Sequence, residues 1–269
     1  MDGFKYLATK KEKYSFEDLC LLATLLRADG GCPWDREQTH KSIRKDIIEE
    51  TYEVIEAIDK EDPDLMREEL GDLLWQVVFH AELEREEGRA DMSDIVHDIC
   101  AKLVHRHPHV FGSVVAETSA VVLDNWEKIK TEEKQRNTVT AKLQSVPPAL
   151  PALMRAQKIG KRAPFFDFAD ADEVLVKIDE ETNELKAAIL SGNKADINEE
   201  FGDLLFTAVS LARKLGIDAE ESLTKASEKF ISRFSVLEQE VIAEGKDITT
   251  LSMAELDAIW DRIKHRSDK

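Results

Sequence analysis

The chain has 269 residues, of which 42% are hydrophobic, so it is long enough to bury a core in each of two domains. Its 37 basic and 55 acidic residues leave a formal net charge of −18. Because binding to nucleic-acid phosphates requires clustered Lys and Arg, this balance argues against general nucleic-acid binding and suits the binding of cations.

The N-terminal residues 1–13 are polar and rich in lysine, and they lack the apolar core of a signal peptide. No stretch of the sequence approaches the roughly 20 apolar residues that a membrane span requires. The three cysteines, Cys20, Cys32 and Cys100, follow no disulfide pattern. Because unpatterned cysteines fit a reducing compartment, we expect a cytoplasmic protein that does not bind membranes.

Helical periodicity runs through nearly every long segment of the chain. In chain order, apolar residues three and four apart predict helices around 47–58, 65–78 and 95–103. Asp62-Pro63-Asp64 predicts the turn between the first two helices, and Ser191-Gly192-Asn193 predicts the matching turn later in the chain. The alternation that is typical of strands is absent over any useful length. The sequence therefore predicts an all-α protein built from helical bundles.

A proline-rich segment divides the predicted helices into two sets. The residues before Pro151 are polar at first and then contain further prolines, which cannot continue a helix. We expect an N-terminal domain at 15–131, a linker at 132–150 and a C-terminal domain at 151–266.

An acidic signature occurs twice, 131 residues apart (49 to 180) and without a gap. Residues 49–54, EETYEV, recur as EETNEL at 180–185, and residues 68–74, EELGDLL, recur as EEFGDLL at 199–205. Self-similarity at a fixed period indicates a duplicated structural unit. The sequence therefore predicts two helical hairpins, each with the same carboxylate site.

The spacing of the acidic residues brings carboxylates together. Glu50 and Glu53, like Glu69 and Asp72, share one face of a helix, and antiparallel pairing of the two helices would make all four converge. Such a cluster is unfavourable, by an amount on the order of several kcal/mol, unless a cation neutralises it. Mg²⁺ or Mn²⁺ is the expected ion, because hard cations bind carboxylate oxygens and leave positions for water and substrate phosphates.

Gly71 and Gly202 lie inside the two acidic helices, where glycine costs about 1 kcal/mol relative to alanine. We expect them to allow close packing of helices or close approach to the metal site.

The two acidic elements, E-E-x-x-E and E-x-x-D, lie 19 residues apart (53 to 72) on two helices, and they resemble those of the MazG family of nucleoside triphosphate pyrophosphohydrolases. The likeness extends over nearly the whole chain, through the tandem duplication and the segments 31–35 (GCPWD), 106–111 (RHPHVF) and 150–158 (LPALMRAQK). It implies a Mg²⁺-dependent enzyme that hydrolyses nucleoside triphosphates to monophosphate and pyrophosphate with broad base tolerance. Nucleotide-pool housekeeping or stress-related nucleotide control is the expected role.

The resemblance assigns site residues in the second copy. Glu180 is a candidate for orienting the attacking water, and a metal-bound hydroxide is the alternative that the sequence leaves open. Trp260 would stack on any base. The implied metal ligands are Glu181, Glu184, Glu200 and Asp203, and the implied nucleotide contacts are Lys177, Glu180, Glu181, Glu199, Asp203, Lys229, Arg233 and Trp260.

The first copy has equivalents of the later basic and aromatic residues at Lys102, Arg106 and Trp126. Aligning Lys102 with Lys229 places Asp98 opposite Lys225, so an anion replaces a cation near the expected phosphate site. We predict that the second copy carries most of the turnover and that the first is weaker or mainly structural, as the resemblance also implies. It further implies a homodimer with four-helix cores, which would cover the apolar surface of each hairpin.

Other sites fit the sequence less well. The spacing of potential zinc ligands does not form the paired elements of a zinc site, and the second copy keeps none of them: His97, Cys100, His105, His107 and His109. A di-iron bundle needs two Glu-x-x-His motifs, and the single one at 37–40 lacks a counterpart. Phosphate-loop and Nudix motifs are incomplete.

The remaining alternative is a non-catalytic module that senses nucleotides or binds a partner protein. Retention of all four carboxylates together with Lys229 and Arg233 in the second copy argues against it, since a sensor could lose ligands.

Overall fold

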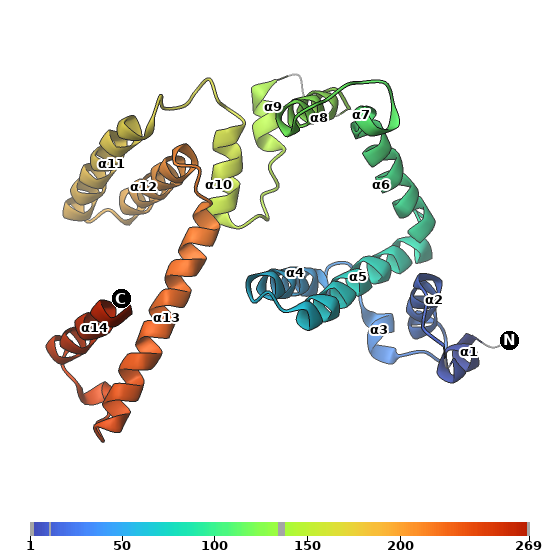
Figure 1. The fold of residues 1–269 in the computed structure, drawn as a ribbon, viewed down its shortest axis with the longest axis horizontal. Coiled ribbons are helices and arrows are strands. Elements are labelled where there is room, and N and C mark those ends of the chain that lie inside the picture. The colour runs from blue at the N-terminus through green and yellow to red at the C-terminus, as the bar shows by residue number, and fades with distance from the viewer. Residues whose placement is uncertain (1–2, 11, 134–137, 268–269) are drawn as a thin grey trace. The chain divides into compact units, whose positions relative to one another are not determined.

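A computed structural model describes residues 3–10, 12–133 and 138–267 (Figure 1). Within these ranges the chain forms fourteen α-helices and one short 3₁₀-helix, and it forms no strand. The all-α prediction is therefore confirmed. None of the described helices combines the length and the apolar character that crossing a membrane requires.

The chain divides into two compact units, Met1–Glu133 and Lys134–Lys269, which we call the N-terminal and C-terminal units. The boundary between them falls inside the segment expected to be a linker. Part of that segment forms the helix α9 (Val139–Gln144). Thr138 caps its N-terminus, because the Thr138 hydroxyl accepts a hydrogen bond from the Ala141 backbone N–H.

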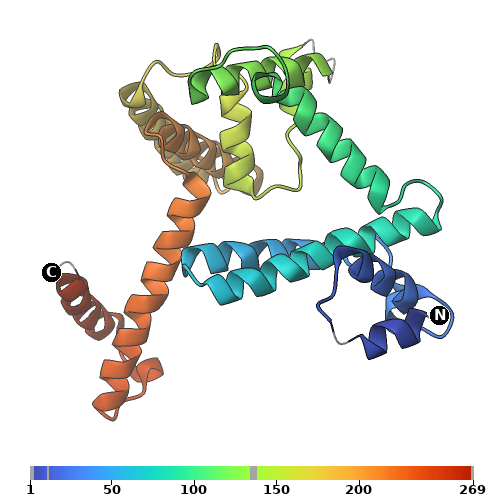
Figure 2. The same cartoon turned by 45° about the vertical axis from the view of Figure 1, so that its right-hand side comes forward.

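The N-terminal unit is organised around a helical hairpin of α4 (Arg44–Asp59) and α5 (Pro63–Glu86), which lie side by side in Figure 1 and Figure 2. The Asp62 side chain accepts hydrogen bonds from the first turn of α5, and Pro63 occupies the first helical position, where no backbone donor is needed. The predicted turn is confirmed. The other helices of the unit are α1 (Gly3–Thr9), α2 (Phe16–Arg27), α3 (Pro33–Glu37), α6 (Met92–Arg106), α7 (Pro108–Phe111) and α8 (Ser119–Glu133).

The C-terminal unit contains the matching hairpin of α11 (Ala171–Ser191) and α12 (Lys194–Lys214), again side by side in both views. Gly192 ends α11 with a left-handed φ of 72°, which glycine adopts without strain, and the Asn193 side chain caps α12. The other helices of this unit, besides α9, are α10 (Ala152–Lys161), α13 (Ala219–Ala243), the 3₁₀-helix η1 (Ile248–Thr250) and α14 (Met253–Ser267).

The loop that enters the C-terminal hairpin is held by a largely buried ionic cluster. Arg213 donates to Asp167 at 2.7 Å, and the Lys214 ammonium lies 2.9 Å from the same carboxylate. Hydrogen bonding from Arg213, opposed by burial and reinforced by Lys214, holds the pKa of Asp167 well below its usual range. This cluster joins the loop to the end of α12.

Each unit has a buried cluster of apolar side chains on, or directly before, helices that carry expected site residues. In the N-terminal unit Ile43, Phe79 and Leu83 pack together, with Trp75 against them. In the C-terminal unit the cluster lies between α13 and α14 and consists of Leu237, Val241, Ile259 and Ile263.

Both hairpins expose large apolar side chains in the single chain. On α4 and α5 they follow a spacing of four and three residues, which places them on one face of each helix. The exposed side chains are Ile48, Tyr52 and Ile55 on α4, Leu70, Leu74 and Val77 on α5, and Phe201, Leu205 and Phe206 on α12.

The two helical glycines do not serve close packing within the single chain. A Cβ atom added at Gly71 or Gly202 would meet no heavy atom within 4 Å among the described residues, apart from the helix's own nearby backbone. The expectation of close helix packing at these glycines is therefore wrong for the described part of each unit.

Candidate metal and nucleotide site

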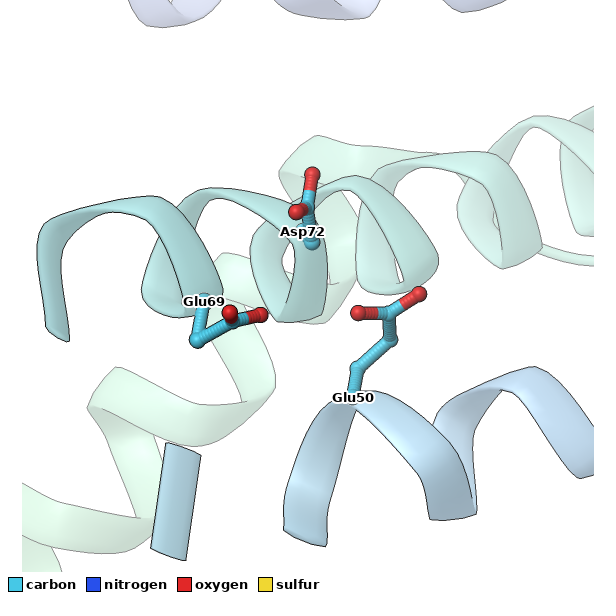
Figure 3. Close-up of side chains that lie close together, drawn as sticks. All are labelled: Glu50, Glu69 and Asp72. Carbon is cyan, nitrogen blue, oxygen red and sulfur yellow. The ribbon is translucent and has the colours of Figure 1, made fainter. Parts of the chain in front are cut away.

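The N-terminal hairpin brings three of its four expected ligands together. Glu50 on α4 and Glu69 and Asp72 on α5 each place a carboxylate oxygen within 4.8 Å of the others. Figure 3 shows Glu50 reaching from its helix toward the helix that carries Glu69 and Asp72. Glu53, the fourth expected ligand, lies outside this close group.

The electrostatics of this first site reflect the crowding of its acidic groups. Burial, followed by the charges of Asp72 and Glu53, raises the pKa of Glu50. Burial and the charge of Glu53 likewise raise the pKa of Glu69. Glu53 therefore contributes to the field of the site. Each raised pKa means that the ionised cluster is held at a cost, which a bound cation would offset.

The C-terminal hairpin also brings three of its four expected metal ligands together, but they are not all counterparts of the three in the first hairpin. Glu181 and Glu184 on α11 and Glu200 on α12 place carboxylate oxygens within 4.8 Å of one another. Asp203 lies one turn beyond Glu200, is exposed and is not part of the close group. Burial, then the charges of Glu184 and Asp203, raise the pKa of Glu200. We call the group of Glu181, Glu184, Glu200 and Asp203 the second site.

A positively charged side chain, that of Lys177, lies against the second site. The Lys177 ammonium lies 2.8 Å from carboxylate oxygens of both Glu180 and Glu181, and these two hydrogen bonds raise the pKa of Lys177 above its usual value. The position 131 residues earlier holds Asp46. The charge beside the acidic cluster is therefore reversed between the two copies. Alignment of the two copies at their period of 131 residues pairs Lys177 with Asp46, but the prediction from the sequence did not use this difference.

Three of the other expected nucleotide contacts of the C-terminal unit lie on a different pair of helices from the carboxylates. Lys229 and Arg233 are on α13, and Trp260 is on α14. Trp260 is half-buried against the cluster between these helices, and its ring lies 5.1 Å from that of Phe230. The structure therefore joins Trp260 to the helix with the basic pair. Glu199 is exposed on α12 next to Glu200.

The N-terminal counterparts of Lys229, Arg233 and Trp260 are Lys102 and Arg106 on α6 and Trp126 on α8. Lys102 is exposed, whereas Arg106 is 8% exposed and donates to Glu133 at 3.1 Å. The Arg106 guanidinium also lies 5.6 Å from the centre of the Trp126 ring. Arg106 and Trp126 thus take part in the packing of α6 against α8.

Comparison with known protein families finds two matching segments, and each of them contains one of the two hairpins. The MazG nucleotide pyrophosphohydrolase domain matches residues 38–111 and 170–235, which contain α4 with α5 and α11 with α12. The nucleoside triphosphate pyrophosphohydrolase of Escherichia coli K12 is 46% identical over 92% of this chain and 96% of its own length.

Two further relatives cover most of this chain. The nucleoside triphosphate pyrophosphohydrolase/pyrophosphatase MazG of Thermotoga maritima is 41% identical over 93% of the chain and 95% of its own length. The protein YabN of Bacillus subtilis is 40% identical over 95% of the chain, which matches 53% of that relative. The domain matches span just over half of the chain, and they contain both acidic hairpins. The chain therefore belongs to the MazG nucleotide pyrophosphohydrolase family.

Proposed function

We propose that this MazG protein hydrolyses nucleoside triphosphates to nucleoside monophosphates and pyrophosphate, with Mg²⁺ as the preferred ion and Mn²⁺ as a substitute. The observation that carries the proposal is the convergence of carboxylates from two helices, with Glu181, Glu184 and Glu200 within 4.8 Å of one another. The activities named for the E. coli and T. maritima relatives support the same reaction.

The residues of the second site fit a hard divalent cation, because all of its donors are carboxylate oxygens. Glu181, Glu184 and Glu200 would hold the ion, and Asp203, one turn from Glu200, is the proposed fourth ligand. A bound Mg²⁺ would supply positive charge to the phosphate oxygens during cleavage. With three or four ligands from the protein, further positions remain for water and phosphate.

The protein's own side chains would bind and orient the reactants. Glu180 is exposed beside Glu181, and we assign it the orientation of the water that attacks the α-phosphorus. Lys229 and Arg233 lie one turn apart on α13, so both can face one polyphosphate. Trp260 offers a ring for stacking, which fits tolerance of different bases. Glu199 completes the proposed nucleotide contacts.

We assign most of the turnover to the second site. There Lys177 adds a positive charge, whereas the first hairpin has Asp46 at the matching position. The two units are accordingly proposed as a weaker or structural N-terminal repeat and a catalytic C-terminal repeat.

We further infer that the chain forms a homodimer in which hairpins pair into four-helix cores. The exposed apolar faces of α4, α5 and α12 support this, because surfaces of this kind mark association. Light scattering on the purified chain tests the dimer.

The free cysteines and a nucleotide substrate fit a cytoplasmic protein.

The test of the activity is a product assay. The full-length protein is incubated with ribo- and deoxyribonucleoside triphosphates and Mg²⁺, and monophosphate, pyrophosphate and orthophosphate are measured separately. Equal amounts of monophosphate and pyrophosphate are expected, and chelation of the metal should abolish both. Diphosphate and orthophosphate would overturn the assigned bond, and nucleotide binding without products would indicate a sensing module.

A further inference from the structure

The ion pair of Lys177 involves the most buried acidic group of the second site. The Glu181 side chain is 6% exposed and that of Lys177 is 33% exposed, and their charged atoms are 2.8 Å apart. Lys177 also lies 2.8 Å from Glu180, which is largely exposed. The ammonium thus bridges a buried carboxylate that belongs to the metal cluster and an exposed one at its edge.

An ammonium and a divalent cation compete for the same carboxylate. Both are positive, and their repulsion is strong when only a few ångströms and little water separate them. A divalent cation that binds Glu181 must therefore either displace the Lys177 ammonium or bind despite the repulsion from its positive charge. A pair between two fully exposed side chains would be too weak to matter, but the burial of Glu181 reduces the screening by water.

A nucleoside triphosphate changes this competition, because its phosphates offer Lys177 several anionic oxygens. If the ammonium moves from Glu181 to a phosphate, the carboxylate becomes available to the cation that accompanies the nucleotide. The first site is the natural comparison, since Asp46 lies one turn before Glu50 there.

We propose that Lys177 is an internal counter-ion that occupies Glu181 until a triphosphate draws it away, so that the second site binds its divalent cation together with the nucleotide. The first site, with an acidic side chain in place of this lysine, binds a cation without that requirement. The inference rests on the proposed function, since it takes the acidic clusters as metal sites and Lys177 as a phosphate contact.

The first experiment measures Mn²⁺ binding in the absence of nucleotide. Full-length protein with Glu50→Gln and Glu69→Gln reports on the second site alone, and equilibrium dialysis gives its affinity for Mn²⁺. Adding Lys177→Met should strengthen that affinity roughly tenfold, because a positive charge is removed from a partly buried site. Lys177→Arg keeps the charge and should keep the weak affinity. An affinity that Lys177→Met changes by less than about twofold overturns the proposal.

The second experiment is the reciprocal change at the first site. In protein with Glu184→Gln and Glu200→Gln, Asp46→Lys should weaken Mn²⁺ binding, and Asp46→Asn provides the neutral control. Equal affinities for the lysine and asparagine variants would contradict the role of the positive charge. Circular dichroism confirms that each variant is folded before its affinity is compared.

The third experiment adds a triphosphate with a methylene bridge between the α- and β-phosphorus, which resists cleavage at that bond. Protein-bound Mn²⁺ at the second site should rise with this analogue when Lys177 is present, and the rise should be much smaller in Lys177→Met. An equal rise in both overturns the coupling. Pyrophosphate release is assayed separately, so failure of the proposed reaction is distinguished from failure of the metal competition.

Discussion

The imidazole rings of His40 and His80 stack in the N-terminal unit, with centroids 4.9 Å apart and Nδ1 atoms 2.6 Å apart. Two nitrogens at this distance can share one proton but cannot each carry one. On its far side, His40 Nε2 lies 2.9 Å from Glu84 and 3.4 Å from Arg89. Burial, followed by the charge of His40 and opposed by Glu84, lowers the pKa of His80 below its ordinary value of 6.5.

This pair predicts that the N-terminal unit loses stability in mild acid. Because the unfolded chain protonates His80 more readily than the folded chain, the free energy of unfolding should fall as pH decreases below about 6.5. His80→Leu should flatten this dependence, and Leu211 occupies the matching position of the second copy. Urea unfolding at several pH values measures the effect, with tryptophan fluorescence as the signal. An unchanged slope in the variant would show that other groups cause the acid sensitivity.

The assignment of turnover to the second site predicts unequal effects of matched substitutions. Glu184→Gln removes one charge from the second site and should lower the rate of pyrophosphate release by about 100-fold, since the cation loses an anionic ligand. Glu53→Gln, at the matching position, should lower it less than about threefold. A larger loss in Glu53→Gln would reverse the assignment.

The ionic cluster at Asp167 predicts a large loss of stability when its arginine is replaced. Arg213→Met leaves a largely buried carboxylate with only Lys214 as a charged partner in this cluster, and should destabilise the C-terminal unit by about 2 to 3 kcal/mol. Arg67→Met is the control, because Arg67 and its partner Asp64 are both exposed. It should change stability by less than about 0.5 kcal/mol. Similar urea midpoints for both variants would contradict the importance of the cluster.

The two environments of helical glycine predict opposite effects of alanine. At Gly202 a Cβ atom meets open space in the single chain, so Gly202→Ala should stabilise α12 by up to about 1 kcal/mol. At Gly160 the Cβ would lie 2.8 Å from Arg213 Nε, whose side chain is held by Asp167, so Gly160→Ala should destabilise. Thermal unfolding measures both. Destabilisation by Gly202→Ala would indicate a contact made outside the single chain, and light scattering would show whether dimerisation is affected.

Several features could be predicted from the sequence because they depend on local geometry. The spacing of Glu181 and Glu184 places both on one helix face whatever surrounds the helix. The chemistry of proline and a capping aspartate predicts a turn before α5 from residues 62–64 alone. The identical spacing of the two acidic signatures likewise predicts two equivalent hairpins, which the structure contains.

Other features depend on how one helix is turned against another, which no spacing along the chain specifies. In the second hairpin Glu200 joins the close group while Asp203 stays outside it, and in the first hairpin it is Glu53 that stays outside. The pairing of Arg106 with Glu133 requires α8 to pack on α6. The sequence by itself determined the helices, the duplicated hairpin and the acidic faces, because these follow from short-range spacing. Tertiary structure alone decided which carboxylates meet and which are buried, because burial and side-chain distance depend on packing between helices.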